Sequence, residues 1–183
     1  MHDERLANLL GALSLTVRDL MLGDVLRATG TSASGAAAIK VAATEPGLSV
    51  TELGRRIGLS QPAAARMIDA LEARGLAERR PAASRSVAVH LTDQGRQAAE
   101  QIRLARIQAL LPLSDSLDEN ERAVLAGLFD KLLDAAYDRL PDSELLCRLC
   151  DGPACLSGGN TCPVSDARNA REAGDTREAT DER

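Results

Sequence analysis

Aromatic residues are almost absent from this chain, and this shortage constrains its fold more than any other feature. The 183 residues include no Trp, one Tyr (Tyr137) and one Phe (Phe129). A core must therefore be built from Leu, Ala, Val and Ile, which favours helices that pack closely through small side chains. Because 44% of the residues are hydrophobic and 27% are charged, the chain can still bury a core. We expect a mainly helical protein rather than a β-sandwich.

The length of the chain allows one compact domain with extensions and excludes a large multidomain enzyme. No apolar run approaches the roughly 18 residues that a membrane span needs. The N-terminal residues also lack the basic and then apolar order of a signal peptide. We therefore expect a cytoplasmic protein that does not bind membranes.

Positive charge is concentrated in one segment of an acidic chain. The net charge is -5, yet residues 48–92 carry seven cations and four anions. Arginine presents a rigid fork of donors that suits phosphates and guanine edges, although a solvated basic face is equally consistent with this count. The cations of the segment are all arginines: Arg55, Arg56, Arg66, Arg74, Arg79, Arg80 and Arg85.

Two helices are predicted before the basic segment. Apolar residues recur at three- and four-residue steps over residues 4–22, which predicts an amphipathic helix that is broken from Gly23 onward. An Ala-rich helix is expected from Ser32 or Ser34 to Thr44.

A helix-turn-helix and a hairpin are predicted within the basic segment. Ser49 and Glu52 have the spacing of a capping box for a short helix that ends at Gly58. Ser60 caps the next helix, which Gly75 ends. Residues 76–80 and 86–91 resemble strands and flank a small-residue tip, which predicts a β-hairpin. This order is typical of a winged helix-turn-helix.

Long helices are predicted after the hairpin, over residues 92–111 and 118–139, with a bend at 112–117. Their apolar stripes exceed what the small core can cover, which predicts a homodimer. The expected fold class is mainly α with a small β-wing. The expected parts are an N-terminal dimerisation helix (1–30), a winged helix-turn-helix DNA-binding domain (31–92), C-terminal dimerisation helices (93–140), a four-cysteine motif (141–164) and a disordered tail (165–183).

The order of these motifs resembles the MarR family of bacterial transcriptional regulators over residues 5–140. Residues 48–54 are similar to the start of the family's first motif helix, residues 59–66 to its recognition helix, residues 71–76 to the exit into its wing, and residues 91–95 to the sequence after the wing. The resemblance implies a dimeric repressor that binds a pseudo-palindromic operator in double-stranded DNA. In many members a small-molecule effector or an oxidant releases the DNA.

The second motif helix is suited to a major groove. Its first turn is small, Gln61 can pair with adenine, Ala65 can contact a thymine methyl group, and Arg66 can reach a guanine or a phosphate. The alternative for Arg66 is an ion pair with Asp69 or a solvated side chain on the Ala70 side of the helix. The candidate DNA-binding residues are Ser60, Gln61, Pro62, Ala63, Ala65, Arg66, Arg79, Arg80 and Arg85.

The wing departs from the family pattern. The family's wing tip typically carries an Asp, an Arg two residues later and then a second Arg, where this chain has Arg80, Ala82 and Arg85. The usual minor-groove arginine is therefore missing. The remaining wing arginines could still hold phosphates, which gives affinity without sequence preference.

All four cysteines lie within sixteen residues, as Cys147, Cys150, Cys155 and Cys162. Structural disulfides are disfavoured in the cytoplasm, so the motif indicates a metal site, a thiol switch or inert thiols. Four thiolates suit tetrahedral zinc or an iron-sulfur cluster. The uneven spacing and the terminal Cys-Pro slightly favour iron-sulfur, by analogy with other regulators.

The sequence thus predicts a DNA-binding regulator whose state depends on its cysteines. One alternative is a regulator that responds to a small molecule and has a structural zinc tail. Another is a redox or metal-handling protein on a winged-helix scaffold. An enzyme is not expected, because the only histidines are His2 and His90 and no nucleophile or phosphate loop accompanies them.

Overall fold

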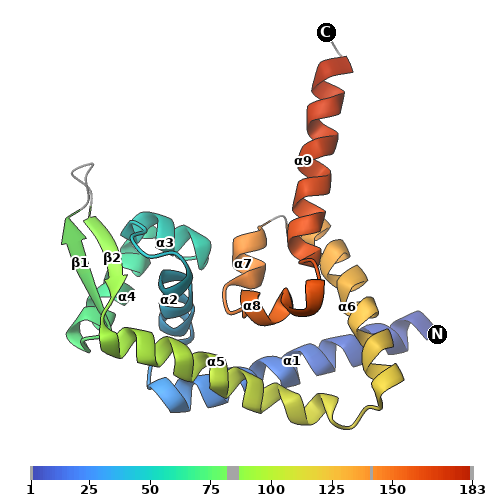
Figure 1. Cartoon of the computed structure of the whole chain (residues 1–183), viewed down its shortest axis with the longest axis horizontal. Helices are drawn as coiled ribbons and strands as arrows, with labels where there is room; N and C mark the ends of the chain where they lie inside the picture. Colours follow the sequence, from blue (N-terminus) through green and yellow to red (C-terminus); the bar gives the residue numbers. More distant parts are fainter. Residues whose placement is uncertain (1, 82–86, 141, 182–183) are drawn as a thin grey trace. The chain divides into compact units, whose positions relative to one another are not determined.

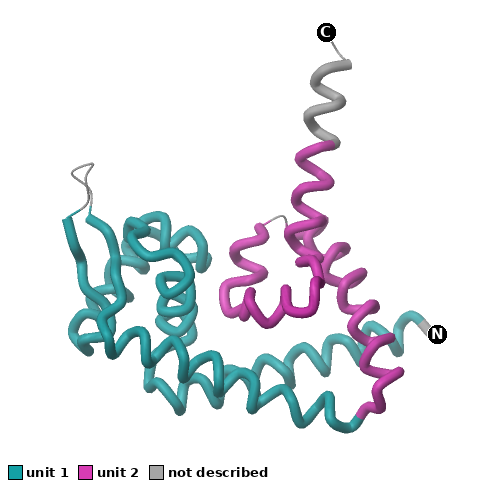
Figure 2. Tube along the Cα trace, viewed as in Figure 1, with its two compact units in different colours: residues 1–116 teal, residues 117–183 magenta. Residues whose placement is uncertain are grey.

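The computed structural model describes residues 2–81, 87–140 and 142–181, with side chains over 3–81, 87–140 and 142–173. The chain forms two compact units, residues 1–116 and 117–183 (Figure 2). Helices dominate, and β1 and β2 form a two-stranded antiparallel sheet (Figure 1). The predicted fold class, mainly α with a small β-wing, is confirmed.

The first unit contains the winged helix-turn-helix and two long helices, α1 (His2–Thr29) and α5 (Asp93–Ser114), which run side by side (Figure 1). α2 contacts α1, α3, α4, α5 and β2, so it lies at the centre of this unit. The core is aliphatic, and its largest fully buried side chains include Ile39, Leu53 and Ile68. The elements are α1 (His2–Thr29), α2 (Ala33–Thr44), α3 (Val50–Arg56), α4 (Gln61–Ala73), β1 (Ala77–Pro81), β2 (Val87–Leu91) and α5 (Asp93–Ser114).

Local signals in the sequence set most helix boundaries of this unit. The side chains of Ser32 and Ser49 accept hydrogen bonds from Gly35 N and Glu52 N, both at 3.1 Å. Gly58 and Gly75 have positive φ angles of 74° and 66°, and each lies two residues after the last residue of α3 or α4. A residue without Cβ adopts this conformation at little cost, which explains where both helices end.

Two predicted helix ends are wrong. α1 continues through Gly23 and stops only before Gly30, which has a φ of 61°. A helical glycine costs only about 1 kcal/mol, and the burial of Val25 in the core outweighs that cost. α5 continues past Pro112 to Ser114, where Asp115 N still donates to Leu111 O at 3.0 Å, so the proline costs the helix one backbone hydrogen bond without ending it.

The second unit contains α6 (Glu119–Arg139), α7 (Ser143–Cys147), α8 (Gly152–Cys155), a 3-10 turn at Ser157–Gly159 and α9 (Pro163–Asp181). The predicted disorder of residues 165–183 is wrong over most of that range, because α9 is helical to Asp181. Val164 and Ala167 pack with Tyr137 of α6 in a small core. Arg171 adds hydrogen bonds to Asp134 and Asp138 of α6, at 2.9 and 2.7 Å. Small and charged residues of α9 make these contacts, so the scarcity of large apolar residues in this segment did not indicate them.

Residues 82–86, which include the predicted wing tip and Arg85, lie outside the described residues. Within the described part of the chain, no helix combines the length and the apolar character needed to cross a bilayer.

Candidate nucleic-acid interface

α3 and α4 form a tightly closed helix-turn-helix. Leu59 N donates to Gly54 O at 2.8 Å and Gly58 N donates to Arg55 O at 3.1 Å, which closes the turn. A Cβ on Gly54 would lie 2.5 Å from the Cβ of Ala64, closer than two carbon atoms can approach. Glycine at position 54 therefore allows α3 to pack directly against α4 and fixes the direction in which α4 projects.

α4 buries one side and exposes the predicted DNA-binding side. Ala64, Met67, Ile68 and Leu71 are buried. The predicted contact residues lie on the accessible part of the helix: Ser60, Gln61, Pro62 and Arg66 are exposed, and Ala63 and Ala65 are half-buried. The structure therefore brings all six residues of this helix together on one accessible surface.

Ser60 occupies the N-cap position of α4 but makes no capping hydrogen bond with its side chain. The predicted side-chain cap is therefore wrong, although the position is right. Because a serine cap normally uses its hydroxyl on the helix backbone, the exposed hydroxyl of Ser60 is available to a ligand.

Arg66 has no hydrogen bond or ion pair to any described residue. One alternative predicted from the sequence, a pair with Asp69, is not formed, because Asp69 pairs with Arg79 at 2.8 Å. The other alternative, a solvated side chain, agrees with the exposure of Arg66. The other described arginines of residues 48–92 all have partners: Arg55, Arg56, Arg74, Arg79 and Arg80. Arg66 is thus the arginine that the described structure leaves available for a phosphate or a base.

The two described wing arginines differ in their surroundings. The side chain of Arg80 is 56% exposed and, among the described residues, pairs only with Glu78 on the same strand. Arg79 is 28% exposed and pairs with Asp69 and Glu72 of α4. Arg80 can therefore turn toward a ligand easily, whereas Arg79 is held against the second motif helix.

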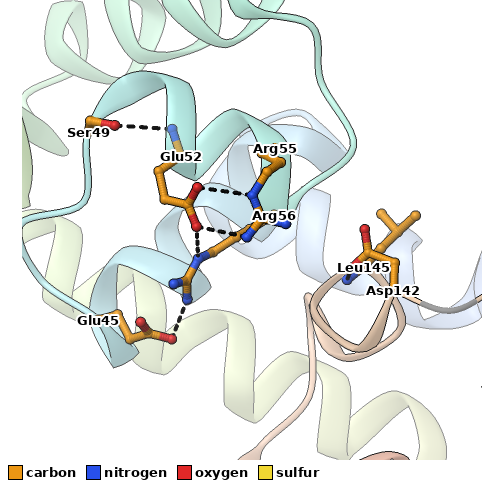
Figure 3. A network of polar contacts seen from close by, with 7 residues as sticks. All are labelled: Glu45, Ser49, Glu52, Arg55, Arg56, Asp142 and Leu145. Carbon is orange, nitrogen blue, oxygen red and sulfur yellow. Dashed lines mark hydrogen bonds and ion pairs between the residues drawn. The ribbon is translucent and has the colours of Figure 1, made fainter. Parts of the chain in front are cut away.

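Arg55 and Arg56 of α3 form an ion-pair network with Glu52 (Figure 3). Arg56 also pairs with Glu45, beyond the end of α2. The hydrogen bonds from Arg55, the larger cause, and from Arg56 lower the pKa of Glu52 from 4.5 to about 2. The expected capping box is only half formed, because the Glu52 carboxylate bonds these arginines while Ser49 caps the helix.

Arg74 is a positioning residue that the sequence analysis did not single out. Its guanidinium donates to Thr29 O and Gly30 O at 2.7 and 2.8 Å, which caps the carbonyl end of α1. This contact ties the end of α4 to the end of α1. Its partners are 44 and 45 residues away, so no local sequence signal could have identified it.

The outer helices expose many large apolar side chains, which form two apolar stripes in the described chain. One stripe is on α1 and the other is on α6. These side chains are 38–66% exposed, more than a folded core would leave uncovered. The stripes consist of Leu6, Leu9, Leu10, Leu13 and Leu20 on α1, and of Val124, Leu128, Phe129, Leu132 and Leu133 on α6.

The four cysteines are free thiols. Cys147 ends α7, Cys155 ends α8 and Cys162 precedes α9, while Cys150 N donates to Cys147 O at 2.8 Å. A hydrogen bond with Cys150, together with burial, raises the pKa of Cys147 above its ordinary value. Cys147 and Cys162 also pack against the small core of α6 and α9.

Thiolates are the donors that zinc and iron-sulfur clusters prefer, so the donor chemistry of this motif fits the predicted metal centre. The geometry does not yet fit it. Among the described side chains, no three His, Cys, Asp or Glu residues converge closely enough to hold a metal ion. Binding would therefore require the thiols to move together and lose their protons.

A small cavity of about 100 Å³ lies beside the wing, lined by residues that include Ala42, Pro46, Arg80 and His90. Ligand pockets for drug-sized molecules usually measure about 300–1,000 Å³. This cavity could therefore admit only a very small effector.

Comparison with known proteins finds similar folds among bacterial proteins of known structure. The sequence model of the MarR family matches residues 41–85. YusO from Bacillus subtilis has a TM-score of 0.65 at 23% identity, over 74% of this chain and 99% of that one. MepR, a transcription regulator of the Staphylococcus aureus multidrug efflux pump MepA, has a TM-score of 0.65 at 16% identity, over 71% of this chain and 97% of that one.

The apo form of MarR from E. coli has a TM-score of 0.58 at 25% identity. It covers 70% of this chain, and 96% of its own length is matched. Nearly the whole of each neighbour is therefore matched, while more than a quarter of this chain has no counterpart in these three proteins.

Proposed function

We propose that this chain, which has the winged-helix fold of the MarR-family transcriptional regulators, is itself a dimeric, sequence-specific DNA-binding regulator of transcription. The observation that carries the proposal is α4. It exposes a small first turn with Gln61, together with an Arg66 that pairs with no described residue. A helix that leaves such groups available, while its other side is buried, is suited to a major groove.

Three residues of α4 have defined roles in this proposal. Gln61 pairs with adenine through its amide, Ala65 contacts a thymine methyl group, and Arg66 binds a guanine edge or a phosphate. Arg80 neutralises phosphates beside the groove, which adds salt-dependent affinity without sequence preference.

The apolar stripes on α1 and α6 support dimerisation. A second copy is the simplest partner that could cover them, and a two-fold dimer presents two copies of α4. The operator is then pseudo-palindromic, with half-sites about one helical turn, roughly 34–36 Å, apart.

Arg66 provides the test. The protein selects duplexes from a random-sequence pool, and fluorescence anisotropy then measures the affinity for a selected duplex. Arg66→Ala should weaken binding by more than about 1 kcal/mol, or about fivefold. The matched control is Arg18→Ala, which removes an exposed arginine of α1 and should bind like wild type. Wild-type affinity in Arg66→Ala would refute the role of Arg66, and failure to enrich any duplex would refute the proposed function.

We further propose that the cysteine motif modulates DNA binding by holding a metal centre, with an iron-sulfur cluster favoured slightly over zinc. The proposal rests on the four thiols gathered in one short segment and on the contact of Cys147 and Cys162 with α6 and α9. A bound cluster would make redox state or iron supply the signal, whereas zinc would mainly stabilise the segment.

Anaerobic purification followed by an absorption spectrum and metal analysis distinguishes these cases. Visible bands with iron and sulfide support a cluster, and one zinc per chain without colour supports a structural tail. Cys150→Ser should abolish metal binding while leaving the helical circular dichroism largely intact. A wild-type protein that contains no metal would refute the proposed metal centre. A regulator that answers to a small molecule would then be the better description.

A further inference from the structure

Arg79 lies between the wing and the second motif helix, where it contacts α4 at four points. Its guanidinium pairs with Asp69 at 2.8 Å and with Glu72. Its backbone N–H donates to Glu72 Oε1 at 2.7 Å, and its side chain reaches Ala65 O at 3.5 Å. Arg79 is one of the phosphate contacts expected from the sequence, but these partners occupy the donors that such a contact would use.

The backbone bond follows from the sheet register. Arg79 of β1 lies opposite Val89 of β2. The backbone N–H of Val89 donates to Leu48 O and its backbone C=O accepts from Gly47 N, both on the side of β2 that faces away from β1. Arg79 and Val89 therefore form a non-hydrogen-bonded pair, in which the backbone N–H and C=O groups of both residues point away from each other. The N–H of Arg79 therefore points out of the sheet edge, and Glu72 satisfies a donor that would otherwise be unpaired there.

Asp69 lies on the face of α4 that carries the candidate DNA contacts, because it is three residues after Arg66 and four after Ala65. Its side chain is 64% exposed. An unpaired carboxylate there would repel DNA phosphates. The positive charge of the Arg79 guanidinium neutralises the negative charges of Asp69 and Glu72.

We infer that Arg79 is a positioning residue for DNA recognition: it fastens the wing strand to α4 and neutralises the two carboxylates of that helix, and it does not itself bind DNA. The inference rests on the proposed DNA-binding function. A single exposed ion pair contributes little, but two carboxylates and a backbone donor joined through one arginine hold both elements in one register.

A double-mutant cycle in DNA binding tests the inference. The variants are Arg79→Ala, Glu72→Ala and the double variant, with binding measured on a duplex that wild type selects. If Arg79 positions the wing, both single variants bind about tenfold more weakly and the double variant is no weaker than Arg79→Ala. Arg79→Lys, which cannot reach all these acceptors, should rescue only part of the loss.

A phosphate contact predicts a different pattern. Removing Glu72 would then release Arg79 toward the DNA and strengthen binding, and Arg79→Ala would reduce the salt slope by about one. Either result overturns the inference. Glu78→Ala, which removes the partner of Arg80 on the same strand, is the control for loss of one negative charge and should not weaken binding.

Two further measurements separate the roles of the contact. Asp69→Asn in the Arg79→Ala background should regain part of the lost affinity, and no regain would refute charge neutralisation. The amide of Arg79 should exchange slowly with solvent in DNA-free wild type and quickly in Glu72→Ala. Fast exchange in wild type overturns the inference even if the chain binds no DNA, so its failure is distinguishable from that of the proposed function.

Discussion

At the scale of single residues, two glycines decide how closely elements of the first unit approach. Gly54 lets α3 meet α4, and Gly95 lets the start of α5 meet the turn after α4. A Cβ on Gly95 would lie 1.9 Å from the carbonyl oxygen of Leu76. Thr92 fixes the same junction, because its side chain donates to Gly75 O at 2.6 Å and accepts from Gly95 N at 3.0 Å.

Gly95→Ala should destabilise the protein by more than about 1 kcal/mol, because the added carbon displaces backbone rather than a flexible side chain. Chemical denaturation measures this loss. The matched control is Gly11→Ala on α1, where nothing lies within 4 Å of the added carbon. That variant should gain about 0.5–1 kcal/mol from the higher helix propensity of alanine. Equal effects at both positions would contradict the steric explanation.

The ion pairs of Glu52 make the folding stability depend on pH. Its folded-state pKa is about 2, below the ordinary 4.5, because Arg55 and Arg56 bond its carboxylate. The stabilising contribution is therefore complete above about pH 4.5 and disappears as the pH falls toward 2. Glu52→Gln should melt below wild type at pH 7, and the difference should vanish near pH 2. A difference that persists in acid would show that the ion pairs are not its cause.

At the scale of elements, the helix starts show how far local signals reach. Serine in the cap position predicted the starts of α3 and α4, and both are confirmed. For α2 the sequence left Ser32 and Ser34 open, and the structure has Ser32 as the cap. The capping bond itself forms at Ser32 and Ser49 but not at Ser60. The sequence therefore predicted the position of the third cap but not the hydrogen bond of its side chain.

Ser49→Ala should cost about 1 kcal/mol of stability, because the N–H of Glu52 loses its partner. Ser60→Ala should cost less than half as much, since no capping bond is lost. In DNA binding, Ser60→Ala should have the larger effect of the two variants, because the hydroxyl of Ser60 lies in the proposed interface. Thermal unfolding and anisotropy on the two purified variants measure both orders. A larger stability loss for Ser60→Ala would contradict the structure of this cap.

At the scale of the whole molecule, the apolar stripes of α1 and α6 are the main feature that a single described chain leaves unexplained. Leu13 on α1 is 46% exposed and Leu128 on α6 is 49% exposed. Hydrophobic surface of this extent favours association. The sequence predicted both stripes, and the proposed dimer is what would cover them.

Leu13→Glu should weaken the dimer at least tenfold, because it places a charge in the proposed interface. Asn8→Glu is the matched control, since it adds the same charge to another side of α1, about 140° around the helix from Leu13. Sedimentation velocity over a range of concentrations measures both dissociation constants. A Leu13→Glu variant that dimerises as well as wild type would exclude the α1 stripe from the interface.

The sequence by itself determined the winged helix-turn-helix, the surface of α4 and the apolar stripes, because these depend on periodicity, capping residues and glycines only a few positions apart. Only the tertiary structure decided which arginine is available. Arg66 and Arg79 look alike in the sequence, yet Arg79 is held by Asp69 and Glu72 of α4 and Arg74 by the carbonyls that end α1. The first turns of α9 likewise pack on Tyr137 and bond the aspartates of α6. Such contacts join residues distant along the chain, and no local pattern encodes them.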